Sequence, residues 1–349
     1  MGRVVRFDAP GSVVLAEEEE PAVGPDEVRV HTLYSGISAG TELTAYRGSN
    51  PYLRKRWDPE RRLFVPGEVS FDYPIDGWGY EEVGRVAEVG KRASSPRVGD
   101  LVWGTWGHRS SAVLAAGYAA ERMLAETADP FDGVFAHIGA IALNAVLDAG
   151  IHVGETVAVF GQGVPGLIAG QLARLNGATV IAVDAIPMRR DLAERLGASS
   201  VLAAERGSVA ERIKELTDGR GADVSIEITG SYRALHEAVR STAYNSTVVA
   251  SGFFQGEAAG LALGEEFHHN RIRIVCSQIS GVNPGLDHRW NELRLQRTVM
   301  SLAAEGKLAL APLISHIVPV DEAADAFALL DREPETAVQV ILSFEGGAR

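Results

Sequence analysis

Three glycines near the middle of the chain are spaced as a dinucleotide-binding turn requires. Residues 156–166 read TVAVFGQGVPG, so an apolar run leads into Gly161, Gly163 and Gly166. In a G-x-G-x-x-G turn the first glycine permits the tight turn and the second lets the backbone approach a pyrophosphate. The third lets the following helix pack closely. We therefore predict that a dinucleotide places its phosphates at the start of that helix.

The residues after the turn complete the pattern. Val164 and Pro165 would open the helix, because a proline in the first helical turn loses no hydrogen bond. A second apolar run at 179–183 ends on Asp184. A strand, a glycine turn, a helix and a second strand ending on an acidic residue form the whole unit. A glycine-rich turn without a ligand is therefore the poorer interpretation.

Asp184 also bears on the choice of cofactor. A carboxylate at this point accepts hydrogen bonds from the adenosine ribose and repels the 2′-phosphate of NADP. Arg189 and Arg190 follow closely and could reach such a phosphate if Asp184 turned away. We predict that the cofactor is NAD.

The secondary structure predicted for the chain changes near residue 130, from short strands to alternating strands and helices. Residues 1–130 read as short strands, such as 28–33, divided by Gly, Pro and acidic turns. Residues 131–285 read as alternating strands and helices, which predicts a doubly wound parallel sheet. Residues 286–349 are expected to return to the first domain. The fold class is therefore α/β with a preceding β-rich domain, and the strands expected in the parallel sheet are 156–160, 179–183, 223–228, 247–252 and 272–276.

Composition narrows the class of protein. A chain of 349 residues exceeds the usual single core, which predicts two domains. The net charge of −13 argues against nucleic-acid and anionic-membrane partners, since both reward basic surfaces. No apolar run approaches the roughly 20 residues of a membrane helix and no signal-peptide pattern is present, so we expect a cytoplasmic protein. The single cysteine, Cys276, excludes a disulfide within the chain and lies in an apolar run that predicts a buried thiol.

Several short motifs resemble those of the medium-chain dehydrogenase/reductase superfamily, which includes alcohol, sorbitol and threonine dehydrogenases. Residues 79–90, GYEEVGRVAEVG, are similar to the family's G-H-E-x-x-G-x-V-x-x-V-G element, and residues 98–102, VGDLV, match its V-G-D-x-V turn. Residues 142–146 and 153–157 resemble the lead-in to its cofactor domain. Residues 35–43, SGISAGTEL, are similar to a branch with bacteriochlorophyllide-type and threonine-dehydrogenase-like proteins. The resemblance implies a GroES-like catalytic domain before a Rossmann cofactor domain.

The resemblance also shows where this chain departs from its zinc-dependent relatives. Those relatives hold the catalytic zinc with a cysteine, the histidine of G-H-E and a later Cys or Glu. The corresponding positions here carry Ser38, Tyr80 and His137. Hydroxyls are poor zinc ligands beside thiolate and imidazole, and Glu81 with His137 would supply only two ligands. We predict a site without metal.

Without zinc, other groups must stabilise the alkoxide and move the proton. Tyr80 and His137 fall where the substrate would lie, and a phenol or an imidazole can do this chemistry. Ser38, Thr41 and Glu42 could extend a proton relay to solvent. The alternative is that Tyr80 fills the space of the metal and His137 hydrogen-bonds a backbone carbonyl. Glu81 is expected to be structural and paired with an arginine.

Two further groups of residues are candidates for contact with the cofactor or with the substrate. The ends of parallel strands line the nicotinamide in such sheets, which makes five residues candidates for cofactor contact: Thr229, Gly230, Gly252, Phe253 and Ser277. Residues 47–62 carry a local excess of arginine and lysine with Tyr52 and Trp57 among them. That segment is interpreted as a solvated loop or as a lid over an anionic or bulky substrate.

Together these observations predict an NAD-dependent, zinc-independent dehydrogenase that interconverts a secondary alcohol and a ketone on a polar, cyclic or sugar-like substrate. A quinone- or enoyl-reductase-like activity is one alternative, although such enzymes usually prefer NADPH. A cofactor-binding protein without catalysis is another. The resemblance implies a homodimer or homotetramer formed through strands near 272–279.

Overall fold

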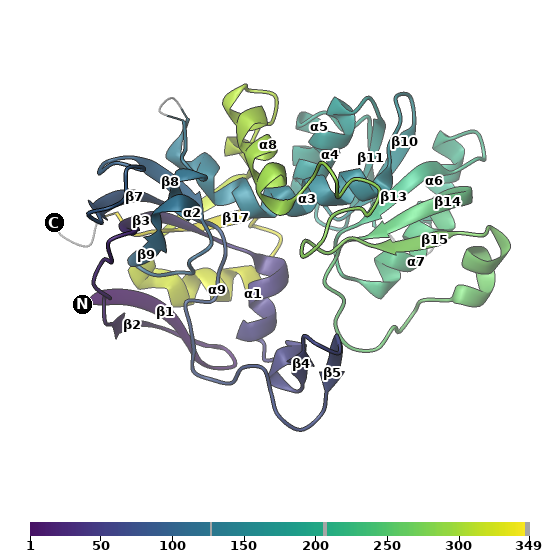
Figure 1. Ribbon diagram of the computed structural model, residues 1–349. Coiled ribbons are helices and arrows are strands. Elements are labelled where there is room, and N and C mark those ends of the chain that lie inside the picture. Colours follow the sequence, from purple (N-terminus) through teal and green to yellow (C-terminus); the bar gives the residue numbers. More distant parts are fainter. Residues whose placement is uncertain (126–127, 205–207, 346–349) are drawn as a thin grey trace. The chain divides into compact units, whose positions relative to one another are not determined.

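The computed structural model describes residues 1–125, 128–204 and 208–345, and it divides into two compact units (Figure 1). The first unit comprises Met1–His137 and Ile314–Arg349, and the second comprises Ile138–Leu313. Residues 286–313, which the sequence analysis assigns to the first domain, therefore belong to the second unit. The reason is packing within that unit: the side chain of Val299 abuts Gly139, and Gln171 hydrogen-bonds the backbone of Ala309.

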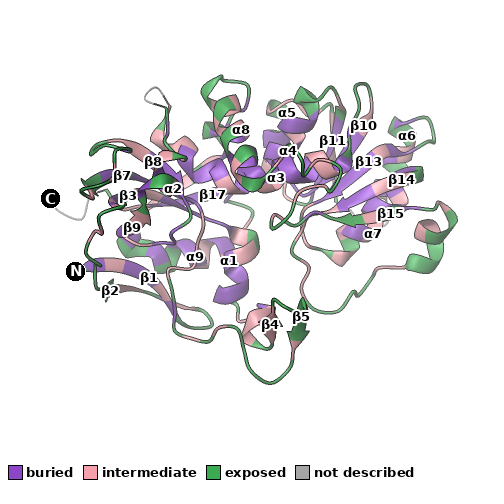
Figure 2. Cartoon of the chain, viewed as in Figure 1, coloured by how far each residue is buried: buried purple, intermediate pink, exposed green. Residues whose placement is uncertain are grey.

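The second unit is built on a six-stranded parallel sheet in the order β12-β11-β10-β13-β14-β15. The strands are β10 (Thr156–Phe160), β11 (Thr179–Asp184), β12 (Ser200–Ala203), β13 (Ala222–Glu227), β14 (Thr242–Ala250) and β15 (Arg273–Cys276). This order confirms the predicted doubly wound sheet, in which β10 and β13 flank the point where the winding reverses. The central strands are buried on both faces (Figure 2), which is why they read as continuous apolar runs.

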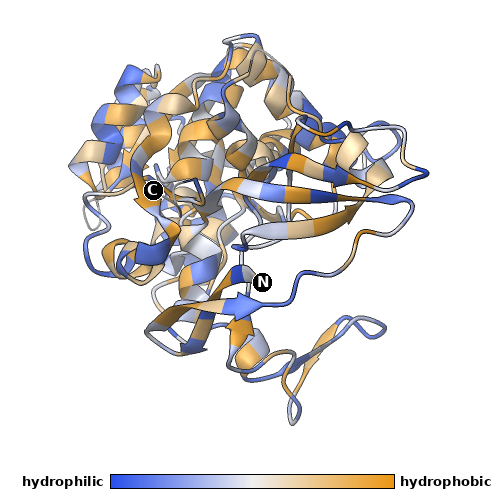
Figure 3. Ribbon diagram, turned by 90° about the vertical axis from the view of Figure 1, so that its left-hand side faces the viewer, coloured by the Kyte–Doolittle hydropathy of each residue, from blue (hydrophilic) through white to orange (hydrophobic). Residues whose placement is uncertain are grey.

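Helices accompany this sheet. They are α3 (Phe135–Ala149), whose first three residues count with the first unit, α4 (Val164–Leu175), α5 (Pro187–Arg195), α6 (Val209–Leu216), α7 (Tyr232–Ser241) and α8 (Glu292–Ala304), with a π-helical turn at Leu263–Phe267 and a 3-10 turn at Ala311–Leu313. Hydrophobic and hydrophilic residues alternate along the helices of the protein in Figure 3, as expected for helices with one face on a core. Phe160, Ile213 and Leu235 lie in the apolar core between the sheet and these helices.

The described residues of the first unit form three sheets, the smallest of which pairs β4 with β5. The largest has the order β16-β17-β3-β7-β8, with β9 also paired to β3, and a smaller sheet has the order β2-β1-β6. The strands are β1 (Gly2–Ala9), β2 (Ser12–Glu18), β3 (Glu27–Ile37), β4 (Arg56–Asp58), β5 (Leu63–Val65), β6 (Ile75–Asp76), β7 (Glu82–Val89), β8 (Leu101–Gly104), β9 (Ser111–Ala115), β16 (Ile314–Pro319) and β17 (Gln339–Ser343). This unit confirms the predicted β-rich domain.

Short helices connect these sheets, and one returning segment completes the unit. The helices are α1 (Ala39–Tyr46), α2 (Ala116–Ala120) and α9 (Ala323–Arg332), with 3-10 turns at Pro51–Leu53, Pro130–Val134 and Val320–Glu322. Phe7, Tyr46 and Phe327 pack together in the core that joins β1, α1 and α9. The end of the chain thus returns to the first unit, but from residue 314 onward.

Two segments differ from the sequence expectations. The basic segment at 47–62 is not a bare loop, because β4 and β5 pair as a two-stranded hairpin within it and just beyond it.

Among the described residues, Pro130–Ala149 is long and apolar enough to cross a membrane, which was not expected from the sequence. Since 67% of that window is buried inside the protein, it is typical of a core helix.

Candidate functional site

The glycine turn after β10 has the geometry that the sequence predicts. Gly161 adopts a φ of +100°, and a Cβ there would lie 2.6 Å from the Thr229 methyl carbon. Gly163 precedes α4, with nothing within 4 Å of the position of a Cβ. At Gly166 a Cβ would lie 1.8 Å from the Gly161 carbonyl oxygen, so only glycine allows the helix to approach this closely. Val164 and Pro165 form the first turn of α4.

Asp184 ends β11 at the same edge of the sheet and is tied to the turn. Its Oδ2 accepts the Gln162 N–H at 2.6 Å, and its Oδ1 accepts the Ile186 N–H at 2.8 Å. The carboxylate lines a cavity of about 650 Å³ together with Gly161, Arg189 and Thr229. A cavity of this size accommodates a cofactor fragment. Arg190 instead donates to the backbone carbonyls of Asp184 and Ala185.

The turns after β13 and β14 lie against each other. Gly230 has a φ of +73°, and a Cβ there would lie 2.6 Å from the Phe253 carbonyl oxygen. At Gly252 a Cβ would lie 2.1 Å from the Gly230 nitrogen. Both positions therefore require glycine for close backbone packing. The structure brings these predicted residues together, and it leaves the Phe253 side chain 41% exposed.

Ser277 follows β15 and is nearly fully buried. The Asn144 side chain donates to Ser277 Oγ at 3.4 Å and to the Gly281 carbonyl at 3.1 Å. Cys276, the residue before Ser277, is exposed rather than buried. The prediction of a buried thiol was wrong because β15 is the edge strand of its sheet, where an apolar run need not be covered.

In the first unit, three hydroxyls meet, and the family resemblance aligns two of them, those of Ser38 and Tyr80, with zinc ligands of relatives. Ser38 Oγ and Tyr80 Oη share a short hydrogen bond, and Tyr80 Oη donates to Thr41 Oγ1 at 3.1 Å. The His137 ring lies against the Tyr80 ring, with centroids 4.8 Å apart. Burial, together with the nearby Glu81 carboxyl, raises the pKa of Tyr80, which keeps its hydroxyl protonated. The cluster can therefore donate a hydrogen bond to an oxygen that gains negative charge.

Glu42 has a different role from the solvent relay that the sequence suggests. Its side chain is fully buried, and its carboxylate accepts the Ser38 backbone N–H at 2.8 Å. Its Oε2 lies 2.6 Å from Nε2 of His108, whose Nδ1 contacts Ser35 Oγ at 2.5 Å. Ser35 in turn donates to Glu82. The path from Glu42 therefore ends inside the protein rather than at its surface.

Sequence reasoning did not identify His108 and Glu82. Both side chains are wholly inaccessible to solvent, which only the structure shows. Burial opposes a charge on His108, but Glu42 outweighs it, so the pKa of His108 is raised. Burial raises the pKa of Glu42 and of Glu82. The pair of His108 and Glu42 thus retains a proton and anchors the start of α1, which carries the hydroxyls.

Glu81 does not pair with an arginine as expected. Its side chain is 1% exposed, and neither carboxyl oxygen has a hydrogen-bond partner among the described residues. It lies over Gly36, where a Cβ would be 2.5 Å from its Oε2, beside the Gln339 amide. Burial, with the charges of Glu42 and Glu82, raises the pKa of Glu81 well above its ordinary value. Burial therefore favours the neutral form of this carboxyl group.

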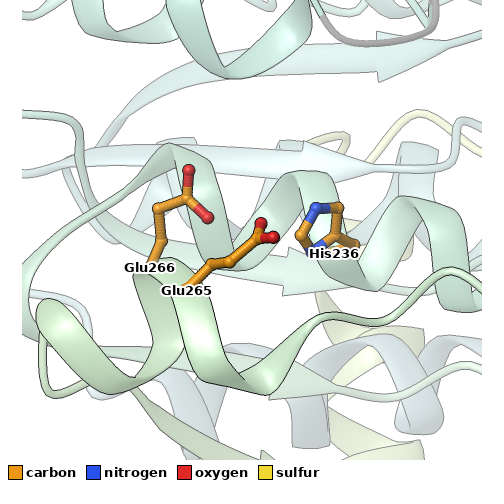
Figure 4. Close-up of side chains that lie close together, drawn as sticks. All are labelled: His236, Glu265 and Glu266. Atoms are coloured by element: carbon orange, nitrogen blue, oxygen red, sulfur yellow. The ribbon is translucent and has the colours of Figure 1, made fainter.

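This donor set does not fit a catalytic zinc ion. Ser38 and Tyr80 supply hydroxyls, which are poor zinc ligands, whereas zinc is held by thiolate, imidazole and carboxylate. Within residues 1–125, 128–204 and 208–345, the only three metal-capable His, Cys, Asp or Glu side chains with ligand atoms within 4.8 Å of one another are in the second unit: His236, Glu265 and Glu266 (Figure 4). Glu266 of that group is already paired with Arg240 at 3.2 Å.

Comparison with known proteins identifies the family that the sequence motifs resemble. Residues 163–297 match the family model described as zinc-binding dehydrogenase. The chain is 31% identical to D-guloside 3-dehydrogenase of Escherichia coli K12, over 96% of this chain and 98% of that protein.

Two solved structures also have this fold. One is 2R,3R-butanediol dehydrogenase of Bacillus subtilis, with a TM-score of 0.78, 22% identity and coverage of 98% and 99% of the two chains. The other is galactitol-1-phosphate dehydrogenase of Escherichia coli, with a TM-score of 0.77, 21% identity and the same coverage. The glycine turn, the sheet order and these relatives agree. The chain belongs to the medium-chain dehydrogenase/reductase superfamily of oxidoreductase enzymes.

Proposed function

We propose that this protein is an NAD-dependent, zinc-independent dehydrogenase that interconverts a secondary alcohol and a ketone on a polar, sugar-like substrate. The observation that carries the proposal is the hydroxyl cluster of Ser38, Thr41 and Tyr80, in which Ser38 and Tyr80 hold positions that the family resemblance aligns with zinc ligands. A cluster of protonated hydroxyls can bind a substrate oxygen by hydrogen bonds, whereas a zinc ion would bind it as a Lewis acid.

Each residue of the proposed site has its own role in binding the substrate or in moving its proton. The nicotinamide of bound NAD would accept the hydride from the alcohol carbon. Tyr80, whose raised pKa keeps it neutral, would turn its single O–H from Thr41 to the substrate oxygen and hold that oxygen as a hydrogen-bond donor. His137 lies against the Tyr80 ring and is the group in contact with it that can take the alcohol proton. Ser38 and Thr41 orient the Tyr80 hydroxyl.

Relatives support a sugar-like substrate. D-guloside 3-dehydrogenase, whose name describes oxidation of one hydroxyl of a glycoside, aligns with almost the whole chain. Galactitol-1-phosphate dehydrogenase, named for a polyol phosphate, shares the fold. A substrate with several hydroxyls would suit Ser38 and Thr41, because each of these hydroxyls can donate and accept a hydrogen bond.

The preference for NAD is supported by Asp184. Its carboxylate is held in place by two backbone N–H groups and lines the cavity beside the glycine turn. A fixed negative charge at this point favours ribose hydroxyls over a 2′-phosphate.

A cytoplasmic homodimer or homotetramer is the assembly that we propose. β15 pairs with β14 on one side only, and the Val275 and Cys276 side chains on it are exposed. An exposed apolar edge strand invites pairing with another chain. Sedimentation of the Val275→Lys variant tests this: a shift to monomer supports an interface at β15, and an unchanged assembly excludes it.

The proposed reaction is tested by replacing the two central groups. In Tyr80→Phe and His137→Ala, oxidation of glycosides and polyols with NAD should fall at least about a hundredfold, the usual contribution of a general acid or base. Tyr73→Phe is the matched control, because that hydroxyl donates to the Ala45 carbonyl, away from the Ser38–Tyr80 cluster. Metal analysis and chelator treatment of the active wild-type protein test zinc independence directly. Wild-type turnover in both variants, or loss of activity with chelator, would refute the proposal.

A further inference from the structure

Glu227 occupies the centre of the cofactor edge of the parallel sheet. It is the last residue of β13, paired with Phe160 of β10 on one side and Ala250 of β14 on the other. The chain continues from these two neighbours into the Gly161 turn and the Gly252 turn. Glu227 is fully buried, and no part of the proposed hydride or proton transfer uses it.

The carboxylate of Glu227 binds the turn that follows its own strand. Oε1 accepts the Thr229 backbone N–H at 2.8 Å and also the Thr229 hydroxyl. Oε2 accepts the Gly230 N–H at 3.3 Å. Thr229 Oγ1 then accepts the N–H of Ser231, which precedes α7. One side chain thus fixes Thr229 and Gly230 directly, and it fixes Ser231 through the Thr229 hydroxyl.

The turn held by Glu227 is packed against both neighbouring turns. The Thr229 methyl carbon lies 2.6 Å from the position of a Cβ at Gly161. The Gly230 nitrogen lies 2.1 Å from the position of a Cβ at Gly252, and Glu227 Oε2 lies 2.8 Å from the same position. Because no side chain separates these backbones, a shift of the Thr229 turn must displace its neighbours.

The turn that Glu227 holds forms part of the wall of the cofactor cavity. Thr229 and Ser231 line the cavity of about 650 Å³ together with Gly161 and Asp184. Glu227 is not among the lining residues, so it acts on the cavity through Thr229. We propose that Glu227 is a positioning residue of the dinucleotide site, whose ionised carboxylate holds the Thr229–Gly230 turn in the shape that receives the cofactor.

The proposal rests on the dinucleotide cofactor inferred above, and it adds a dependence on pH. Burial raises the pKa of Glu227 to about 7, although bonds from Thr229, Gly230 and Ser231 favour the ionised form. Burial and these bonds are the main causes, rather than the charges of the ionisable side chains that line the cavity, which are Asp184, Arg189, Arg233, His236, Glu237 and Arg240. A protonated carboxyl would face the same N–H donors with one acceptor fewer, so the turn would loosen as the pH falls below about 7.

Fluorescence titration of the whole protein with NADH between pH 6 and pH 8.5 tests the proposal. Wild-type affinity should fall as the pH decreases through about 7, and binding near that pH should release protons to a weakly buffered indicator. In Glu227→Gln the new amide N–H₂ opposes the Gly230 N–H. NADH should then bind at least about tenfold more weakly at pH 8, the loss expected for one charge-assisted hydrogen bond, and the pH dependence should disappear.

Two further variants keep the result interpretable. Glu227→Asp retains a titrating carboxylate and should retain a pH dependence, with intermediate affinity. Asp223→Asn removes a carboxylate from the opposite end of the same strand, where it accepts the Thr156 N–H, and should leave NADH binding unchanged. Wild-type affinity and pH dependence in Glu227→Gln would overturn the positioning role. Absence of NADH binding by the wild-type protein would instead overturn the proposed cofactor itself.

Discussion

Nε2 of His108 lies 2.6 Å from Oε2 of Glu42, and neither side chain is exposed to solvent. A buried pair of this kind costs desolvation energy, so it is weak evidence for stability as a whole. Its effect here is local, because the same Glu42 carboxylate accepts the N–H of Ser38, whose hydroxyl belongs to the proposed active site.

His108→Ala should destabilise the protein by about 3 kcal/mol or more, because it leaves Glu42 buried without its partner. Urea unfolding measures the loss. The matched control is His31→Ala, an exposed histidine on β3, which should change stability by less than about 0.5 kcal/mol. Equal effects of the two substitutions would contradict the pairing.

The pH dependence of the wild-type protein follows from the same pair. Because the pKa of His108 is raised in the folded state, its protonated form stabilises the fold fully below the unfolded pKa of about 6.5. That contribution is lost as the pH rises through the raised folded pKa. The free energy of unfolding should therefore decrease toward alkaline pH, and the decrease from this source should be absent in His108→Ala.

Glu81→Gln should stabilise the protein at neutral pH. Burial raises the pKa of Glu81 in the folded protein, whereas the unfolded chain ionises it above about pH 4.3, so the carboxyl group costs stability above that pH. Glutamine removes that cost, and the gain should be about 1 kcal/mol or more at pH 8 and close to zero at pH 4. Thermal unfolding at both pH values provides the measurement. A loss of stability at pH 8 would indicate that the Glu81 carboxyl has a partner essential to the fold.

Gly163→Ala and Gly166→Ala should separate cofactor binding from folding. A Cβ at Gly163 meets nothing within 4 Å, so the variant should fold normally but bind NADH weakly, because the methyl group enters the space of the pyrophosphate. A Cβ at Gly166 would lie 1.8 Å from a backbone oxygen, and that variant should lose at least about 2 kcal/mol of stability. Circular dichroism and NADH titration together distinguish the two outcomes.

Asp184→Asn should shift cofactor preference toward NADPH by about tenfold, because the variant keeps the shape of the residue and removes the charge that repels a 2′-phosphate. Titration with NADH and NADPH measures the ratio of the two dissociation constants. Asp191→Asn, on an exposed part of α5, is the matched control and should leave this ratio unchanged. If NADPH already binds the wild-type protein more tightly than NADH, the assignment of Asp184 is wrong.

The dinucleotide half could be predicted from sequence because its signals are local. Gly161 has a positive φ and Gly166 has a close backbone approach, and both features exclude other residues. Gly163 completes the spacing at the start of α4, and β10 was predicted with its observed bounds from its apolar run alone. β12 was missed because its four residues are only partly buried and give no continuous apolar run.

The hydroxyl cluster could be predicted only through the family resemblance, since Ser38 and Tyr80 are 42 residues apart and no spacing rule joins them. His108 and Glu42 are farther apart still, by 66 residues, and their pairing depends on three-dimensional packing. Glu227 was missed for another reason: a glutamate at a strand end resembles an ordinary surface residue until the packing of the neighbouring turns shows that it is buried.

The place of β17 has a consequence for how the protein is made. This strand lies between β16 and β3, and its Val340 pairs with Ile37, the residue immediately before Ser38. The ribosome completes all of residues 138–313 before it reaches β17. The dinucleotide unit is therefore free to fold while the first unit still lacks this strand. The hydroxyls at Ser38 and Thr41 therefore gain their final support late in synthesis, and truncation before residue 339 removes that support while sparing the cofactor half of the chain.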